Sequence, residues 1–282
     1  MQEVVIGELT RKPVRIGRGR PLAWIAGPCV LEDQRTMAVA AERLKKLSEK
    51  LDVGIVFKSS FEKDNRSSAE FYSGPGIDEG LELLAWIRKE FELPVLSDVH
   101  RVDDVAAAAE VLDVIQIPAF LCQQTSLVLA AGESGKVVNV KKGQFLTPEG
   151  MSSPVGKLER SGNRRILLTE RGVCFGYNQL VADMTSIPLM QGLGYPVVFD
   201  AGHQVRRYGM PSSDPNGGAP EFIPLLIRAA IAAGTNAIFL ETHPSPPQAL
   251  CDAASQYPLE QMEDLIARSA ELAELIRAQG CA

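Results

Sequence analysis

The sequence lacks three features that would each point to a particular class of protein. It has no apolar run approaching the roughly 18 to 20 residues of a membrane span. It has no CxxC pair, and its five cysteines are scattered rather than arranged as a disulfide framework. It has no basic tail, and its net charge is −6. We therefore expect neither a nucleic acid nor a membrane as a partner, although a local basic pocket for small anions stays open.

The chain starts with Met1-Gln-Glu-Val-Val-Ile6, whose apolar stretch is short and whose charge is acidic, unlike a signal peptide. Together with the odd number of cysteines, this start predicts a protein of the reducing cytoplasm. No linker or low-complexity segment divides the 282 residues. We predict that residues 1–20 form a short N-terminal hairpin or arm and that residues 21–282 form a single domain.

Short apolar segments alternate with longer amphipathic ones along this domain. The predicted strands are residues 22–27, 53–57, 94–98, 113–117, 136–140, 165–169, 196–200 and 236–240. The predicted helices are residues 34–51, 76–91, 102–111, 123–131, 149–160, 179–190, 221–233 and 259–279. Such alternation indicates an α/β fold with parallel strands, and eight units fit a closed (β/α)8 TIM barrel. An open doubly wound sheet is the alternative, but Gly27-Pro-Cys-Val30 is not the glycine-rich loop that it would usually carry.

Every predicted strand has polar or ionisable residues at or just after its carboxyl end, where such barrels build their active sites. These are Cys29, Lys58, Asp98, His100, Gln116, Lys141, Lys142, Arg171, Asp200, His203, Glu241 and His243. Any one of them has a structural explanation, such as a helix cap or a small buried side chain. Their presence after all eight strands favours a functional site. The longest irregular stretch, residues 204–220, has the length of a lid.

Cations and hydroxyls are densest in Lys58-Ser-Ser-Phe-Glu-Lys-Asp-Asn-Arg-Ser-Ser68. Lys and Arg form charge-assisted hydrogen bonds with phosphate, and serine hydroxyls add neutral ones. Lys58 and Lys63 would meet Lys141 and Arg171 from two other strands. Because clustered cations need anions to balance them, this set predicts a site for two anionic groups, such as two phosphates or a phosphate and a carboxylate.

A second set combines one thiol, one imidazole and two carboxylates: Cys29, His203, Glu241 and Asp252. Such a mixed donor set suits a borderline divalent ion, namely Zn²⁺, Fe²⁺ or Mn²⁺. The four residues lie far apart in the sequence, so their spacing alone leaves metal binding open.

Several longer motifs occur in order between about Ile25 and Leu259. They are Phe57-Lys-Ser-Ser-Phe61, Lys63-Asp-Asn-Arg-Ser-Ser68, Tyr72-Ser-Gly-Pro-Gly76, Ser97-Asp-Val-His100, Asp113-Val-Ile-Gln-Ile-Pro-Ala-Phe120, Asn139-Val-Lys-Lys142, Phe175-Gly-Tyr177 and Phe199-Asp200. This series resembles the 3-deoxy-D-manno-octulosonate-8-phosphate synthase (2-dehydro-3-deoxyphosphooctonate aldolase) family. The resemblance implies a TIM barrel with an N-terminal hairpin over its bottom, usually in a homotetramer. It also implies a transferase that condenses phosphoenolpyruvate with D-arabinose 5-phosphate and water in lipopolysaccharide precursor biosynthesis, releasing inorganic phosphate.

The resemblance further implies residue roles. Phosphoenolpyruvate would bind Lys58, Ser60, Lys63, Gln116, Ala119, Lys141, Arg171 and His203. The sugar phosphate would bind Asn65, Arg66, Ser67 and Asp98, with Arg66 and Ser67 reaching the site of a neighbouring subunit. The implied catalytic group is Asp98, His203, Lys141 and Asn65.

The family has a metal-free class with asparagine at the position of Cys29 and a metal-dependent class with cysteine there. Cys29, with His203, Glu241 and Asp252 at the other ligand positions, implies the second class and one divalent ion. Asp64 departs from the family pattern, because many relatives have alanine at that position. It adds a negative charge near the expected sugar-phosphate site.

Three other functions fit parts of this pattern. A sister synthase of aromatic biosynthesis uses erythrose 4-phosphate, but its relatives carry Lys-Pro-Arg-Thr where this chain has Lys63-Asp-Asn-Arg66. A Schiff-base aldolase would use Lys58 or Lys141 as its nucleophile. A catalytically silent sugar-phosphate binder is the third.

Overall fold

The computed structural model describes residues 1–8, 10, 12–66, 68–176, 179–207, 209–211 and 214–279. Eight parallel strands form the barrel: β3 (Ala23–Gly27), β4 (Ile55–Lys58), β5 (Val95–Asp98), β6 (Val114–Ile117), β7 (Val137–Lys141), β8 (Ile166–Glu170), β11 (Val197–Asp200) and β12 (Ala237–His243). They pair in this order, and β12 pairs with both β11 and β3, which closes the ring. The prediction of a (β/α)8 barrel is confirmed.

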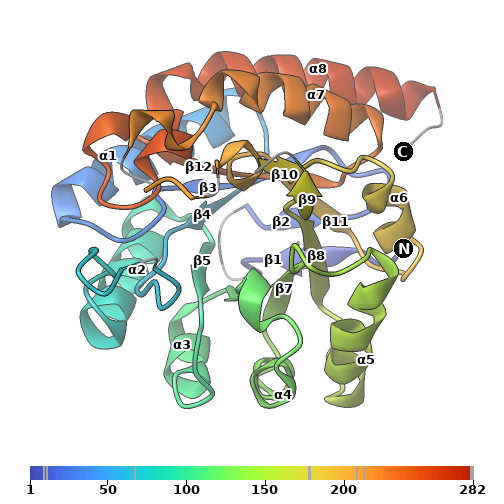
Figure 1. The fold of residues 1–282 in the computed structure, drawn as a ribbon, viewed down its shortest axis with the longest axis horizontal. Helices are drawn as coiled ribbons and strands as arrows, with labels where there is room; N and C mark the ends of the chain where they lie inside the picture. Colours follow the sequence, from blue (N-terminus) through green and yellow to red (C-terminus); the bar gives the residue numbers. More distant parts are fainter. Residues whose placement is uncertain are drawn as a thin grey trace.

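Helices lie around the strands on the outside (Figure 1). In the described part of the chain they are α1 (Gln34–Lys50), α2 (Ile77–Phe91), α3 (Val105–Val111), α4 (Thr125–Glu133), α5 (Ser152–Arg160), α6 (Ser186–Gln191), α7 (Ile223–Ala232) and α8 (Met262–Ala278). Helix α1 illustrates the local causes. Asp33 caps it by accepting a hydrogen bond from the Thr36 amide, and Met37 and Leu44 face the barrel. No helix among the described residues is both long and apolar enough to cross a membrane.

An N-terminal hairpin closes the end of the barrel where the strands begin, as the resemblance implied. We refer to this amino-terminal end as the lower end and to the carboxyl end as the upper end. Its strands, β1 (Val4–Ile6) and β2 (Val14–Ile16), pair antiparallel. Ile6 and Ile16 are fully buried in a cluster with the lowest inward-facing residues of the barrel strands. This apolar contact makes the hairpin a plug at the amino-terminal ends of the strands.

The interior of the barrel changes from apolar to polar toward the carboxyl ends of its strands. In β7, Val137 belongs to the lower cluster, and Asn139 and Lys141 follow at alternate positions. In β11, Val198 is followed in the same way by Asp200. Since alternate residues of a strand face the same side, these polar groups point into the upper part of the barrel. The site must therefore lie at the upper end.

One predicted helix is wrong in its first part. Residues 179–190 were expected to be helical, but Gln179–Val181 forms strand β10, which pairs antiparallel with β9 (Val173–Gly176). Leu180 is buried between two exposed neighbours, which is the period of a strand. The helix in this region is limited to α6, because the backbone of Gln179–Val181 is hydrogen-bonded in the β9–β10 hairpin.

Candidate active site

A cavity of about 690 Å³ lies at the carboxyl ends of the barrel strands. Five cationic side chains line it: Lys63, Arg66, Arg171, Arg206 and Arg207. Among its described lining residues, Asp252 is the single carboxylate. This excess of positive charge suits an anionic ligand, and the arginines suit phosphate or carboxylate groups in particular.

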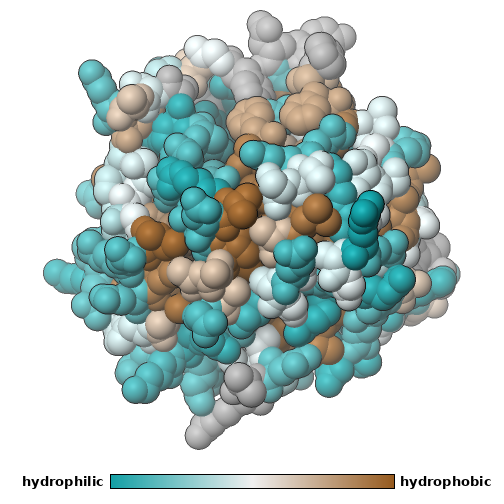
Figure 2. Space-filling view, turned by 90° about the horizontal axis from the view of Figure 1, so that it is seen from below, coloured by the Kyte–Doolittle hydropathy of each residue, from teal (hydrophilic) through white to brown (hydrophobic). Residues whose placement is uncertain are grey.

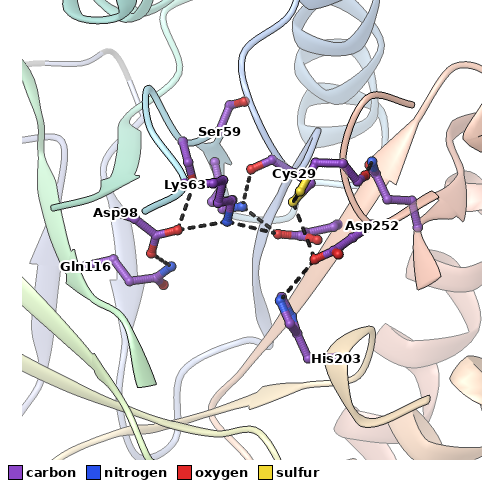
Figure 3. Close-up of polar contacts among 12 residues, drawn as sticks. Cys29, Ser59, Lys63, Asp98, Gln116, His203 and Asp252 are labelled. Carbon is purple, nitrogen blue, oxygen red and sulfur yellow. Dashed lines mark hydrogen bonds and ion pairs between the residues drawn. The ribbon is translucent and has the colours of Figure 1, made fainter. Parts of the chain in front are cut away.

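Asp98 is the hub of the polar groups below this cavity (Figure 3). Its Oδ2 accepts hydrogen bonds from Lys63 Nζ at 2.9 Å and Ser60 Oγ at 2.7 Å, and its Oδ1 accepts one from Gln116 Nε2 at 2.6 Å. Burial opposes ionisation of this carboxyl, yet Lys63 and Lys58 hold the pKa of Asp98 well below its usual range. Burial would also lower the pKa of Lys63, but Asp98 and other nearby groups raise it well above its usual value. Asp98 and Lys63 therefore form a charged, oriented pair.

The network continues across the next two strands. Asn139 Nδ2 donates to Gln116 Oε1 at 2.8 Å, and Thr169 Oγ1 donates to Asn139 Oδ1 at 2.7 Å. Gln116 is 1% exposed, and Asn139 and Thr169 are fully buried. This chain of hydrogen bonds fixes the amide of Gln116, and thereby the carboxylate of Asp98. Asn139 and Thr169 were not among the site residues predicted from the sequence.

Asp200 organises the opposite wall. Its Oδ2 lies 2.6 Å from Lys141 Nζ and 2.8 Å from His203 Nδ1. Burial alone would raise the pKa of Asp200. The charges of His203 and Lys141 nevertheless lower this pKa far below its usual value. Burial lowers the pKa of Lys141 despite its contact with Asp200. Because Asp200 engages Nδ1 of His203, the Nε2 atom is left to face Asp252, 3.8 Å away.

The four predicted metal ligands do not form one compact group. Among the described residues, two triplets have donor atoms within 4.8 Å of one another: His203, Glu241 and Asp252 in one, and Cys29, Cys251 and Asp252 in the other. Asp252 joins them, because its Oδ2 is 3.7 Å from Cys29 Sγ and 3.8 Å from His203 Nε2. Two ligands of one tetrahedral ion with bonds of about 2.0–2.3 Å lie roughly 3.3–3.8 Å apart, so these spacings and this donor set fit a divalent ion.

Asp252 has a backbone conformation that is uncommon outside glycine. Its φ is 50° and its ψ is 32°, the left-handed conformation that costs a non-glycine residue free energy. Burial would raise the pKa of Asp252, but the ion pair with Arg206 lowers it. Burial also raises the pKa of the Cys29 thiol well above its usual value, and the neighbouring Cys251 adds to this. A buried thiol beside clustered charges with shifted pKa values is typical of a functional site.

Some of the remaining predicted residues line the cavity, and others lie deeper and support the residues that do. Asn65, Arg66, Arg171 and His203 line the cavity, Ala119 is buried in the short helix after β6, and Ser67 lies outside the described residues. Lys58 lies deeper. Its Nζ donates to Cys29 O at 2.8 Å and to Glu241 Oε1 at 2.6 Å. It therefore holds other site residues in place.

Other strand-end residues have structural partners. His243 Nε2 lies 3.2 Å from Glu32, and Lys142 Nζ lies 3.5 Å from Glu170. Asp64 contacts Arg101 at 3.3 Å, so a cation partly offsets its charge.

Three further residues at the site were not predicted from the sequence: Cys251, Arg206 and Arg207. Arg206 and Arg207 lie in the irregular stretch 204–220, where periodicity gives no signal. Cys251 directly precedes Asp252, and that adjacency was the one signal available.

Comparisons with known proteins agree with this geometry. The model of the DAHP synthetase I family matches residues 4–278. The 2-dehydro-3-deoxyphosphooctonate aldolase of Trichlorobacter lovleyi is 50% identical over 270 residues, which are 96% of this chain and 99% of that protein. Proteins with the same name from Protochlamydia amoebophila and Syntrophotalea carbinolica are 48% and 52% identical. They cover 95% and 89% of this chain, and 98% and 90% of their own lengths.

Proposed function

Because this chain belongs to the DAHP synthetase I family, we propose that it is a 3-deoxy-D-manno-octulosonate-8-phosphate synthase. It condenses phosphoenolpyruvate with D-arabinose 5-phosphate and water, giving the eight-carbon sugar acid phosphate and inorganic phosphate. The observation that supports this most strongly is the group of five cations around one cavity above the Asp98 network. Two phosphorylated reactants need such a charge balance. The erythrose 4-phosphate alternative has less support, since the relatives named above carry the aldolase name.

In this proposal Lys63, Lys141 and Arg171 bind the phosphate and carboxylate of phosphoenolpyruvate. Asn65 and Arg66 bind the sugar phosphate, with Ser67 beside them. Holding the vinyl carbon over the aldehyde carbon supplies much of the rate by proximity. A carbon–carbon bond forms, the aldehyde oxygen takes a proton, and water adds to the carbon that bears the phosphate ester. That carbon–oxygen bond to phosphate then breaks, which releases inorganic phosphate and the ketone.

Asp98 and His203 are the proposed proton carriers. Asp98 is ionised, so it accepts a proton or a hydrogen bond from a sugar hydroxyl rather than donating one. Cys29, His203, Glu241 and Asp252 would hold one Zn²⁺, Fe²⁺ or Mn²⁺ ion. When bound, such an ion supplies Lewis acidity that orients the water or polarises the aldehyde.

The test is phosphate release from phosphoenolpyruvate with a panel of aldose phosphates, before and after removal of metal. We expect turnover with D-arabinose 5-phosphate, little with erythrose 4-phosphate, and loss of turnover on chelation. Preference for erythrose 4-phosphate would show that the protein is instead the sister synthase of aromatic biosynthesis. Borohydride trapping of a lysine with substrate would favour the Schiff-base aldolase, and binding without turnover would favour a silent binder.

We also propose a cytoplasmic homotetramer in which the segment that carries Arg66 and Ser67 contributes to the neighbouring site, although within a single subunit the Arg66 side chain lines its own cavity. Large exposed apolar residues support an interface: Phe120 is 55% and Phe145 is 51% exposed. Apolar residues also gather at the centre of the side where α3, α4 and α5 lie (Figure 2). Light scattering gives the assembly size. If sites are shared, mixing inactive Arg66→Ala and Lys141→Ala variants restores partial activity. If each subunit is self-sufficient, the mixture stays inactive.

A further inference from the structure

Cys251 lies beside the proposed metal site, yet the four-residue ligand set leaves it out. Its sulfur is 2.9 Å from the sulfur of Cys29, and the two side chains are 2% and 0% exposed. We propose that Cys251 is a second thiolate ligand of the bound ion, so that the site prefers Zn²⁺ to Mn²⁺. This rests on the metal dependence proposed above and specifies which ion the site takes.

The backbone directs two adjacent side chains to the same place. Successive side chains of an extended chain point to opposite sides. The left-handed conformation of Asp252 breaks this alternation, so that Cys251 Sγ and Asp252 Oδ2 lie 2.9 Å and 3.7 Å from Cys29 Sγ. The turn is held by hydrogen bonds from Gln256 Nε2 to Cys251 O at 2.8 Å and from the Ser255 amide to Asp252 O at 2.9 Å. This arrangement presents a sulfur and an oxygen together.

The distances require only a small adjustment. Two thiolates on one zinc ion, each bonded at about 2.3 Å and separated by a near-tetrahedral angle, have their sulfurs roughly 3.7–3.8 Å apart. The two sulfurs would therefore separate by roughly 0.8–0.9 Å on binding. Cys29 and Cys251 pack only with Val30 in their small apolar cluster.

The charges around the pair also suit a second thiolate. Arg66 Nη1 lies 2.6 Å from Cys251 Sγ, and Arg206 forms an ion pair with Asp252. Each of these anionic ligands thus has its own guanidinium, which offsets the extra negative charge. Thiolate donors favour Zn²⁺, whereas Mn²⁺ favours carboxylates and water. A site with two sulfurs therefore selects zinc more strongly than a site with one.

X-ray absorption at the zinc edge of the zinc-loaded wild-type protein tests the ligand count without any mutation. We expect two sulfur neighbours at about 2.3 Å. One sulfur neighbour overturns the proposal. Cobalt loading gives a second measure, because each thiolate adds intensity to the sulfur-to-cobalt charge-transfer band. Cys251→Ser should show about half the wild-type intensity, and the control Cys122→Ala, whose cysteine is in neither metal group, should keep all of it.

Metal selectivity gives a further readout. Cys251→Ser should lose roughly tenfold or more in zinc affinity while manganese affinity changes little. Equal losses for both ions contradict the inference. One sulfur neighbour in a protein that still binds metal and turns over refutes the inference alone. A wild-type protein that binds no divalent ion refutes the proposed metal dependence together with it.

Discussion

The Nζ atom of Lys58 lies 2.6 Å from Oε1 of Glu241, and the two side chains are 1% and 2% exposed. The pair joins the end of β4 to β12 across the closing strand β3, and Lys58 also bonds to the Cys29 carbonyl between them. Removing one member of such a pair leaves the other charge buried and uncompensated. This relationship makes Lys58 a positioning residue for the proposed metal site.

Lys58→Met should therefore lower the free energy of unfolding by about 3–5 kcal/mol, measured by urea denaturation. The double variant Lys58→Met/Glu241→Gln should recover at least half of that loss, because neither charge is then left alone. If Lys58→Met only raised the KM for phosphoenolpyruvate and left stability unchanged, Lys58 would be a substrate ligand instead.

The buried amide of Asn139 supports a second prediction. Asn139→Ala removes the partners of Gln116 Oε1 and Thr169 Oγ1, so we expect a loss of about 2–4 kcal/mol in urea denaturation. Turnover should also fall, because Gln116 would no longer hold Asp98 firmly. Thr169→Val is the matched control. It removes one hydrogen bond and should cost about 1 kcal/mol. Equal losses in the two variants would contradict the network.

Tyr195 gives a prediction for alkaline pH. Burial and the hydrogen bond to Glu159 Oε1, 2.6 Å long, raise the pKa of Tyr195 to about 12. The unfolded chain loses this proton near pH 10, whereas the folded protein keeps it. The contribution to stability is therefore complete below pH 10 and is lost as the pH rises toward 12.

Urea denaturation at pH 9 and pH 11 measures this effect. The wild type should lose about 1.3 kcal/mol more over this interval than Tyr195→Phe, which has no phenol to titrate. Identical pH dependence in the two proteins would show that the hydrogen bond to Glu159 does not control the phenol.

Cys29→Ala should abolish metal binding and turnover together, measured by metal analysis after dialysis and by phosphate release. Chelation of the wild type should stop turnover, and adding Zn²⁺, Fe²⁺ or Mn²⁺ should restore it. Cys122→Ala is the control, since this buried cysteine belongs to neither metal group. Full activity of Cys29→Ala after exhaustive chelation would refute the metal dependence.

The barrel could be predicted from local patterns because its strands and helices differ in length and period. Segments such as 53–57 and 34–51 each contain their own signal. The prediction of a helix over residues 179–190 failed because the backbone of Gln179–Val181 is paired with the preceding strand β9. Helical spacing does not reveal such a contact.

The strand-end rule identified Asp98, Lys141 and Asp200, because a strand fixes where its last residues point. It missed Asn139 and Thr169, which lie one layer deeper and look like ordinary buried polar residues. Cys251 and Arg206 come from irregular segments, whose direction depends on contacts with distant parts of the chain. The partners of Lys58 also needed the structure, since 183 residues separate it from Glu241.

The hairpin over the lower end of the barrel separates the part of the molecule that stabilises the fold from the part that receives reactants. Ile6 and Ile16 pack on the lowest inward-facing residues of the strands, whereas the cavity lies at the opposite end. Because buried side chains such as those of Val137 and Phe239 fill the interior between the two ends, no reactant passes the hairpin. The loops around the cavity can therefore vary with the substrate without loosening the hairpin and its apolar contacts.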